Sequence, residues 1–240
     1  MKFRLHNGFA IAIAWPTTLC KQVGAWYDHL MNRVRISKNG YYKVGHSALL
    51  LVDQSTGYCR YFDFGRYHSP HGLGRVRSEK TDHDLKIKTK AVFSADFTKI
   101  QNLHTILEEL FHNYSTHGSG TIYGSAVKIN YDKALAHVNW LQAKEFIPYG
   151  PFLPKGTNCS RFVNSAILSG NPPLQVKLLL KSPPTLTPTP MWNVRAIGSA
   201  VILSKEGTCE YANQKAKKAK PLFTIKTMIY DRLTQNITRT

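Results

Sequence analysis

Two short apolar segments near the N-terminus constrain the fold of this chain more than any other feature. Residues 9–15 read FAIAIAW and end at Pro16, and residues 44–53 read VGHSALLLVD. Both are shorter than the roughly 18 apolar residues of a membrane span, and short apolar runs of this kind are typical of buried strands. The chain has 240 residues, of which 42% are hydrophobic and 11% aromatic. This composition excludes a largely disordered protein, and the length suffices for a sizeable core.

The second apolar segment predicts a hairpin with residues 58–66, because QSTG at 54–57 is a short turn-forming connection. A loop that closes symmetrically within this connection pairs Ala48 with Asp63. His46 and Asp63 then lie on one face of the sheet as diagonal neighbours, roughly 7 Å apart at the backbone. A slip of one residue would place the phenylalanines that flank Asp63 on that face instead.

The remaining segments predict helices and strands in an irregular order. Helices are expected over residues 97–114 and 131–143, from Asn158 onward, and from Pro16 with Leu19, Val23, Trp26, Tyr27 and Leu30 on one face. Strands are expected over residues 85–93, 122–129 and 194–203, and an ordered loop over 67–84. Because these elements do not alternate as regular βαβ units, the fold class is α+β.

The composition changes near residue 182. Residues 1–181 predict one α+β domain, and SPPTLTPTP at 182–190 predicts an extended connection. We expect residues 182–240, which include a basic run at 214–220, to pack on this domain or to trail from it. The run is either a solvated tail or a binding surface.

The chain carries 32 Lys and Arg against 14 Asp and Glu, a formal charge of +18. This charge favours anionic partners such as nucleic acid, another anionic polymer or an acidic protein. No helix-turn-helix, zinc-finger or RNA-binding aromatic motif accompanies it. The N-terminal segment lacks a signal-peptide cleavage pattern, so we expect a cytoplasmic protein, with export by a non-standard route left open.

Cys159 carries the strongest chemical signal. It follows the Pro- and Gly-containing loop at 148–157 and begins a predicted helix. A helix N-terminus favours the thiolate, which is the nucleophile, and its N–H groups can hold an oxyanion. His46 is the candidate base, and Asp63 could fix the imidazole tautomer. The alternatives are a buried structural thiol at Cys159 and, for Asp63, an ion pair with one of three arginines: Arg60, Arg66 or Arg75.

Other residues offer weaker signals. Cys20 also follows a predicted helix start and is either a second candidate nucleophile or a structural thiol, whereas Cys59 and Cys209 lie on predicted strands. One loop could supply metal ligands or be tied together by hydrogen bonds to arginine; its residues are His68, His71, Asp82, His83 and Asp84. We expect no metal and no cofactor. Four arginines could bind a substrate carboxylate or phosphate, or could be solvated charges with Asp63, Asp82 and Asp84 as partners: Arg66, Arg75, Arg77 and Arg161.

The order of these motifs resembles the circularly permuted branch of the NlpC/P60 papain-like superfamily. A His begins a strand, a second strand follows, and NCSRFV begins a late helix, over about residues 46–167. The resemblance implies a papain-like fold and a cysteine hydrolase, an amidase, peptidase or acyltransferase acting on an amide or ester bond. Cys159 would be the nucleophile, His46 the base and Asp63 the third polar residue.

The expected substrate is a peptide or another amide-containing molecule. The residues expected to contact it are Asn158, Ser160, Tyr149 and Arg66. The motifs YFDFGRY, YGPF and NCSRFV also resemble those of a bacterial family without an established activity. The competing interpretation is a papain-like binding module without catalysis, whose basic surface would bind nucleic acid or another anionic polymer.

Overall fold

A computed structural model of the chain describes residues 6–22, 29, 33, 37–42, 44–204 and 209–212. Its centre is an eight-stranded antiparallel sheet in the order β11-β10-β8-β1-β5-β6-β7-β9. The strands are β1 (Gly8–Trp15), β5 (His46–Asp53), β6 (Cys59–Gly65), β7 (Leu73–Ser78), β8 (Ile122–Ile129), β9 (Ile147–Pro148), β10 (Ala200–Leu203) and β11 (Cys209–Ala212). A small second sheet contains β2 (Cys20–Lys21), β4 (Tyr41–Tyr42) and β3 (Ser37–Lys38).

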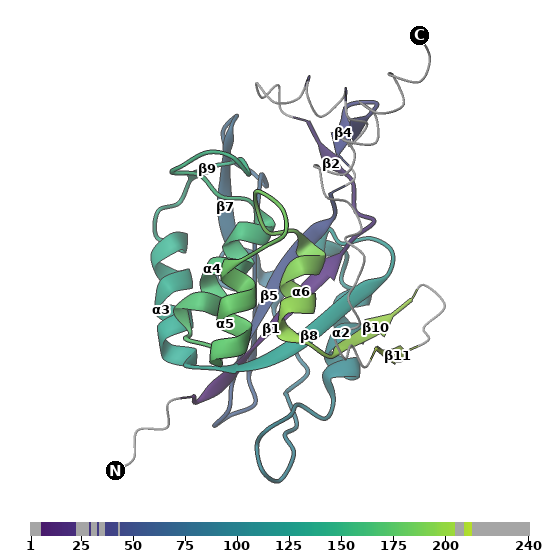
Figure 1. The fold of residues 1–240 in the computed structure, drawn as a ribbon, viewed down its shortest axis with the longest axis vertical. Coiled ribbons are helices and arrows are strands. Elements are labelled where there is room, and N and C mark those ends of the chain that lie inside the picture. The colour runs from purple at the N-terminus through teal and green to yellow at the C-terminus, as the bar shows by residue number, and fades with distance from the viewer. Residues whose placement is uncertain are drawn as a thin grey trace, which may run out of the picture.

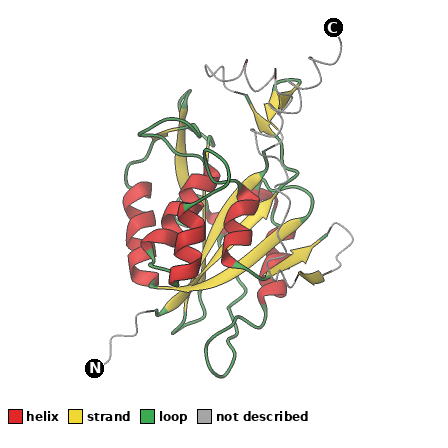
Figure 2. Ribbon diagram, viewed as in Figure 1, coloured by secondary structure: helices red, strands yellow, loops and turns green. Residues whose placement is uncertain are grey.

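Helices cover both faces of the large sheet. They are α2 (Leu103–His112), α3 (Tyr131–Gln142), α4 (Cys159–Ser169), α5 (Leu174–Lys181) and α6 (Pro190–Ile197), with single turns η1 (His83–Leu85) and η2 (Tyr114–Thr116). Helices α3 to α6 lie together in front of the sheet in Figure 1, and Figure 2 shows the same layering by colour. The predicted class, α+β with an antiparallel sheet packed against helices, is confirmed.

Strand β1 shows how the sequence separates the two faces. Ala10, Ala12 and Ala14 belong to the core on the side of α3 to α6, whereas Ile11 and Ile13 belong to the core beneath α2. Side chains alternate across a strand, so FAIAIAW directs small residues to one face and large residues to the other. Both faces are fully buried, which explains the absence of polar residues from this strand.

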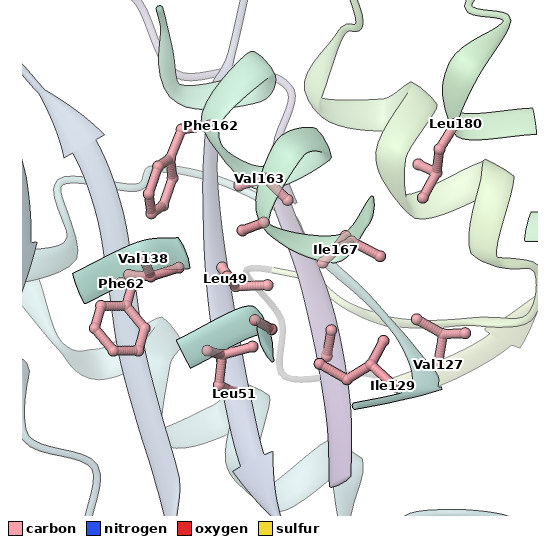
Figure 3. Close-up of a cluster of buried hydrophobic side chains, with 14 of the residues drawn as sticks. Leu49, Leu51, Phe62, Val127, Ile129, Val138, Phe162, Val163, Ile167 and Leu180 are labelled. Atoms are coloured by element: carbon pink, nitrogen blue, oxygen red, sulfur yellow. The ribbon is translucent and has the colours of Figure 1, made fainter. Parts of the chain in front are cut away.

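Helix α4 packs along β5. Phe162, Val163 and Ile167 of the helix belong to the same buried cluster as Leu49 and Leu51 of the strand, as Figure 3 shows. This packing fixes α4 relative to β5. It therefore determines where the first residue of the helix lies relative to the first residue of the strand.

The predicted hairpin register is confirmed. Strands β5 and β6 are antiparallel, with Ala48 opposite Asp63 and Val52 opposite Cys59. Strand β8 has the predicted bounds, and α3 differs from its predicted range by one residue at its C-terminal end. These elements have strong periodic patterns and clear turn residues at their ends.

Two predictions between residues 67 and 93 were wrong. The expected loop over 67–84 contains β7, whose Gly74 has no room for a side chain because an added Cβ would lie 2.8 Å from the Phe64 ring. The expected strand over 85–93 forms no strand. Its backbone N–H groups at Lys88 and Thr89 donate to the Glu109 carboxylate instead of a neighbouring strand.

Three further boundaries differ from expectation. Helix α2 begins at Leu103 rather than at 97, because Phe97 has a left-handed φ of 54°. The strand expected over 194–203 begins only at β10, because Thr189 caps α6 and accepts a hydrogen bond from the Trp192 N–H. The helix expected from Pro16 does not begin there, because Cys20 pairs with β4.

Some predictions fall outside the described residues. The later positions of the helix expected from Pro16 are among them, as is the basic run at 214–220. The proposed boundary between 1–181 and 182–240 stays a prediction. On its C-terminal side, α6 and β10 pack on the same sheet as the elements before it.

Candidate active site

Cys159 is the first residue of α4, as the sequence predicts. The side-chain oxygen of Asn158 accepts a hydrogen bond of 2.9 Å from the Arg161 N–H and so caps the helix. The Arg161 guanidinium donates to the carbonyls of three residues in the preceding loop: Gly150, Pro151 and Leu153. This loop is thereby held against the first turn of α4, and the Cys159 side chain is buried with 6% exposure.

His46 begins β5 and contacts both Cys159 and Asp63. Its Nε2 lies 3.4 Å from the Asp63 carboxylate, and its side chain is close enough to the Cys159 thiol for each group to shift the pKa of the other. The Trp15 ring stacks on the imidazole, with 5.7 Å between ring centroids and 18° between ring planes. The structure therefore brings together the three residues that the sequence analysis selected.

The charges of these groups stabilise one another. Burial lowers the pKa of the His46 imidazole, but hydrogen bonds to Asp63 and Cys159 raise it to about 9. Burial raises the pKa of the Cys159 thiol, but the hydrogen bond and charge of His46 hold it below its ordinary value, with smaller effects from Ser160 and the Ser47 backbone. Each of the two charges favours the other, and a thiolate is the nucleophilic form of cysteine.

Asp63 is fully buried and accepts hydrogen bonds from three side chains. The Arg77 guanidinium donates to both carboxylate oxygens, and the Tyr61 hydroxyl donates to Oδ2 at 3.0 Å. Burial raises the pKa of the Asp63 carboxyl, but His46 and Arg77 hold it below its ordinary value. The ion pair involves none of the three arginines named from the sequence.

The sequence analysis did not name Tyr61 as part of this site, and it named Arg77 only among four arginines that could bind a substrate anion or be solvated. The alternation of side chains along a strand could have identified Tyr61, because it lies two residues before Asp63 on the same face of β6. The position of Arg77 opposite Asp63 could not be predicted in this way, because its strand was predicted to be a loop. It pairs directly opposite Asp63 in the β6–β7 register.

Cys20 does not share these properties. It lies in the two-residue strand β2, and its Sγ donates to the Gly45 carbonyl at 3.5 Å. Burial and the nearby Cys159 raise the pKa of the Cys20 thiol to about 12, with Arg66 acting in the opposite direction. Burial likewise raises the pKa of Cys59 to about 12. Among the thiols whose side chains are described, only that of Cys159 has a lowered pKa.

Comparison with known proteins places the chain in a family. The sequence model of the family described as type VI secretion system effector TseH-like matches residues 10–175, a range that includes His46, Asp63 and Cys159. The chain belongs to this family. No curated protein sequence matches it.

A solved structure also resembles this TseH-like chain. The crystal structure of the type VI secretion system effector TseH is similar with a TM-score of 0.55. The similarity covers 85% of this chain and 97% of TseH, at 16% sequence identity. At this identity the likeness supports the fold alone.

In this TseH-like chain, the residues expected to contact substrate surround Cys159. Tyr149 stacks on Phe64 with 5.8 Å between ring centroids, and the Arg66 guanidinium lies 5.0 Å above the Tyr149 ring. Ser160 is buried, and its carbonyl accepts a hydrogen bond from Asn193 in α6. Asn158 caps α4. Substrate contact by these residues stays a prediction.

The loop with candidate metal ligands is tied by arginine. Arg75 donates to both carboxylate oxygens of Asp82, at 2.9 and 2.8 Å. Within the described ranges, no group of three or more His, Cys, Asp or Glu side chains could hold a metal ion. None of the helices in that part of the chain is long and apolar enough to cross a membrane.

Proposed function

We propose that this chain is a cysteine hydrolase of the amidase or peptidase type, with Cys159 as nucleophile, His46 as acid and base, and Asp63 as the residue that orients His46. The observation that carries the proposal is the position of the His46 imidazole, which lies 3.4 Å from the buried Asp63 carboxylate and lowers the pKa of the Cys159 thiol. A nucleophile, a base and a third group that orients the base are the parts that an activated cysteine requires.

The first half of the reaction acylates the enzyme. The Cys159 thiolate attacks the carbonyl carbon of an amide or ester, and the carbonyl oxygen becomes an oxyanion. The first N–H groups of a helix have no intrahelical acceptor, so we assign those of Cys159 and Ser160 to the oxyanion. The His46 imidazolium then protonates the leaving amine or alcohol as the carbonyl bond to it breaks, which leaves a thioester.

The second half releases the acid. His46 is now neutral and accepts a proton from water, whose oxygen attacks the thioester carbonyl. The bond to Sγ breaks, and the carboxylic product leaves the thiolate and imidazolium as they were. Throughout, Asp63 stabilises the imidazolium and fixes the ring without taking the proton.

Two further observations support a papain-like hydrolase. The His strand precedes the Cys helix, as in the permuted relatives that the sequence resembles. Helix α4 packs on the sheet that carries His46. Since the family is one of type VI secretion system effectors, we further propose that the chain is exported by that route and acts on a peptide or other amide in a target cell, rather than remaining in the cytoplasm.

Two measurements test the chemistry before the substrate is known. The first is the alkylation of each cysteine by iodoacetamide between pH 5 and 9, located by mass spectrometry. The second is acylation by p-nitrophenyl acetate, a simple ester. We expect Cys159 to be alkylated at pH 5 to 6 while Cys20 and Cys59 are not, and we expect a burst of p-nitrophenol with an acetyl group on Cys159.

The matched control is Cys20→Ala, which should behave like the unmodified chain in both measurements. Equal labelling of Cys159 and Cys20 at acid pH would contradict an activated thiolate. An acetyl group on another residue would contradict the assigned nucleophile.

A further inference from the structure

Arg77 connects the candidate site to a column of stacked side chains. Its guanidinium donates to Asp63 through both Nε and a terminal nitrogen, and Arg77 is only 3% exposed. The flat face of the guanidinium lies 3.7 Å from the centre of the Tyr67 ring. Tyr67 in turn stacks on the ring of His117, with 4.6 Å between ring centroids. The guanidinium is therefore fixed both in its plane and perpendicular to it.

This arrangement restricts the Asp63 carboxylate. Oδ1 accepts from Arg77, whereas Oδ2 accepts from Arg77, Tyr61 and His46. A bidentate pair with a planar guanidinium prevents rotation of the carboxylate about its Cβ–Cγ bond. Since His46 directs Nε2 at Oδ2, the other ring nitrogen, Nδ1, is left for Cys159.

When the thiolate and imidazolium are formed, Cys159 and Asp63 are negative, whereas His46 and Arg77 are positive. The charges therefore alternate in sign from Cys159 through His46 and Asp63 to Arg77. Burying one unpaired carboxylate beside the imidazolium would be costly, and a buried charge needs a partner and hydrogen bonds. Arg77 supplies both for Asp63.

We propose that Arg77 is a positioning residue of this site: it holds Asp63 ionised and oriented, and through Asp63 it fixes the protonation of His46 and Cys159. This inference rests on the proposed cysteine site and extends it by a residue beyond the three that the sequence selected. It also gives strand β7 a role in the site, because this strand carries Arg77 opposite Asp63.

The same strand offers a matched comparison. Arg75 lies two residues before Arg77, on the same face of β7, and also makes a bidentate pair with a carboxylate, that of Asp82. Asp82 lies in the turn that precedes η1, and none of its hydrogen bonds reaches His46. Arg75 also donates from Nε to the Tyr67 carbonyl at 2.7 Å, so its replacement removes a similar ion pair and a support of Tyr67 but no hydrogen bond to Asp63.

Other titratable groups surround the site and stay in place in these variants. They are Tyr61 on β6, Arg66 and Tyr67 after β6, Cys20 on β2, Tyr149 after β9 and His117 after η2. Removal of one buried positive charge favours protonation of every nearby group. Loss of the Arg77 charge therefore favours protonation of Asp63, which then no longer raises the pKa of His46, so the pKa of His46 should fall while that of Cys159 rises.

The experiment follows iodoacetamide alkylation of Cys159 against pH in the full chain. In the unmodified protein, the rate of Cys159 alkylation should change twice with pH. The first change, the acid step, occurs where the thiolate forms, and the second, the alkaline step, occurs near the pKa of His46. In Arg77→Met the acid step should move to higher pH and the alkaline step to lower pH, each by about one unit. Arg77→Lys, which keeps the charge, should leave both steps in place, and Arg75→Met should do the same.

Each outcome bears on the inference separately from the proposed function. If the unmodified chain shows no acid step below the ordinary thiol range, the proposed cysteine site itself fails. If it shows that step and Arg77→Met keeps the same profile, Arg77 is only structural and the inference is overturned. Should Arg77→Met fail to fold, Arg77→Gln replaces it, since glutamine keeps a donor for Asp63 but lacks the charge; the same shift is then expected.

Discussion

Cys159 and Cys20 present the same local signal in the sequence and have opposite properties in the structure. Both follow a Pro-containing segment at a predicted helix start. Cys159 begins an 11-residue helix, whereas Cys20 lies in a two-residue strand. The pKa of Cys159 is lowered, and that of Cys20 is raised to about 12.

The difference comes from the neighbours of the two thiols rather than from burial. Burial is the largest influence at both residues, and at both it raises the thiol pKa. At Cys159 the hydrogen bond and charge of His46 outweigh it. At Cys20 the hydrogen-bond partner is the Gly45 carbonyl, which favours the protonated thiol. The Cys159 thiol is therefore activated by a nearby imidazole, which the Cys20 thiol lacks.

The largest effect should come from exchanging the two thiols for alanine in turn. Cys159→Ala should abolish the p-nitrophenol burst and lower any turnover by about 10³-fold or more, because no other group in the site can attack the carbonyl. Cys20→Ala should keep both. Activity lost in Cys20→Ala and kept in Cys159→Ala would reverse the comparison.

Removal of the base should make Cys159 resemble Cys20. In His46→Ala the thiol keeps its burial but loses its cation, so its pKa should rise by about two units and its alkylation at pH 6 should fall by about 100-fold. The control is His117→Ala, which removes a nearby ring stacked on Tyr67. If both variants slow alkylation equally, loss of packing rather than loss of the base explains the effect.

Asp63→Asn should have a smaller and different effect. Asp63 raises the pKa of His46, so its loss should move the alkaline step of Cys159 alkylation to lower pH by about one unit or more. The buried Arg77 loses its partner, and the free energy of unfolding should fall by about 3 kcal/mol, as measured in urea. Asp82→Asn, the matched change in the second Arg–Asp pair, should leave the alkaline step in place.

The sequence predicted those features that depend on local patterns with period two or 3.6. Alternation and a four-residue connection fixed the register of β5 and β6, and so predicted that His46 and Asp63 share a face. The helix start at Asn158 and Cys159 was predicted from the Pro- and Gly-containing loop that precedes it. Each of these features is set by residues close together in the chain.

The features that were missed depend on contacts between distant segments. Strand β7 contains Gly74, against which the Phe64 ring packs, and two arginines that pair with the carboxylates of Asp82 and Asp63. Glycine and charged residues are typical of a loop, so the sequence alone did not predict this strand. Residues 85–93 alternate like a strand, yet the Glu109 carboxylate of α2 accepts the N–H groups of Lys88 and Thr89. Cys20 resembles a helix start, but pairing with Tyr42 makes it a strand.

The smallest predicted effect concerns the support of Cys159 from the C-terminal part of the described chain. Asn193 of α6 is fully buried; its Nδ2 donates to the Ser160 carbonyl at 2.8 Å, and its Oδ1 accepts from Asn164 of α4 at 3.0 Å. Asn193→Ala removes both hydrogen bonds, although the Asn164 amide still donates to the Leu180 carbonyl at 3.0 Å. The free energy of unfolding should fall by about 1 to 3 kcal/mol, and Cys159 alkylation should slow only a few-fold, with no change at Cys20.

The control for Asn193→Ala is a Gly/Ser replacement of the connection before α6. Leu186 in this connection is 84% exposed, whereas Thr189 caps α6 and the buried Pro190 begins it. Replacement of residues 183–188 alone should therefore leave both the unfolding free energy and Cys159 alkylation close to those of the unmodified chain. If this replacement costs as much as Asn193→Ala, the connection itself belongs to the folded core, and the predicted boundary at residues 181 and 182 is wrong. If only Asn193→Ala has an effect, α6 supports the first turn of α4 directly, and Cys159 depends on a contact that Cys20 lacks.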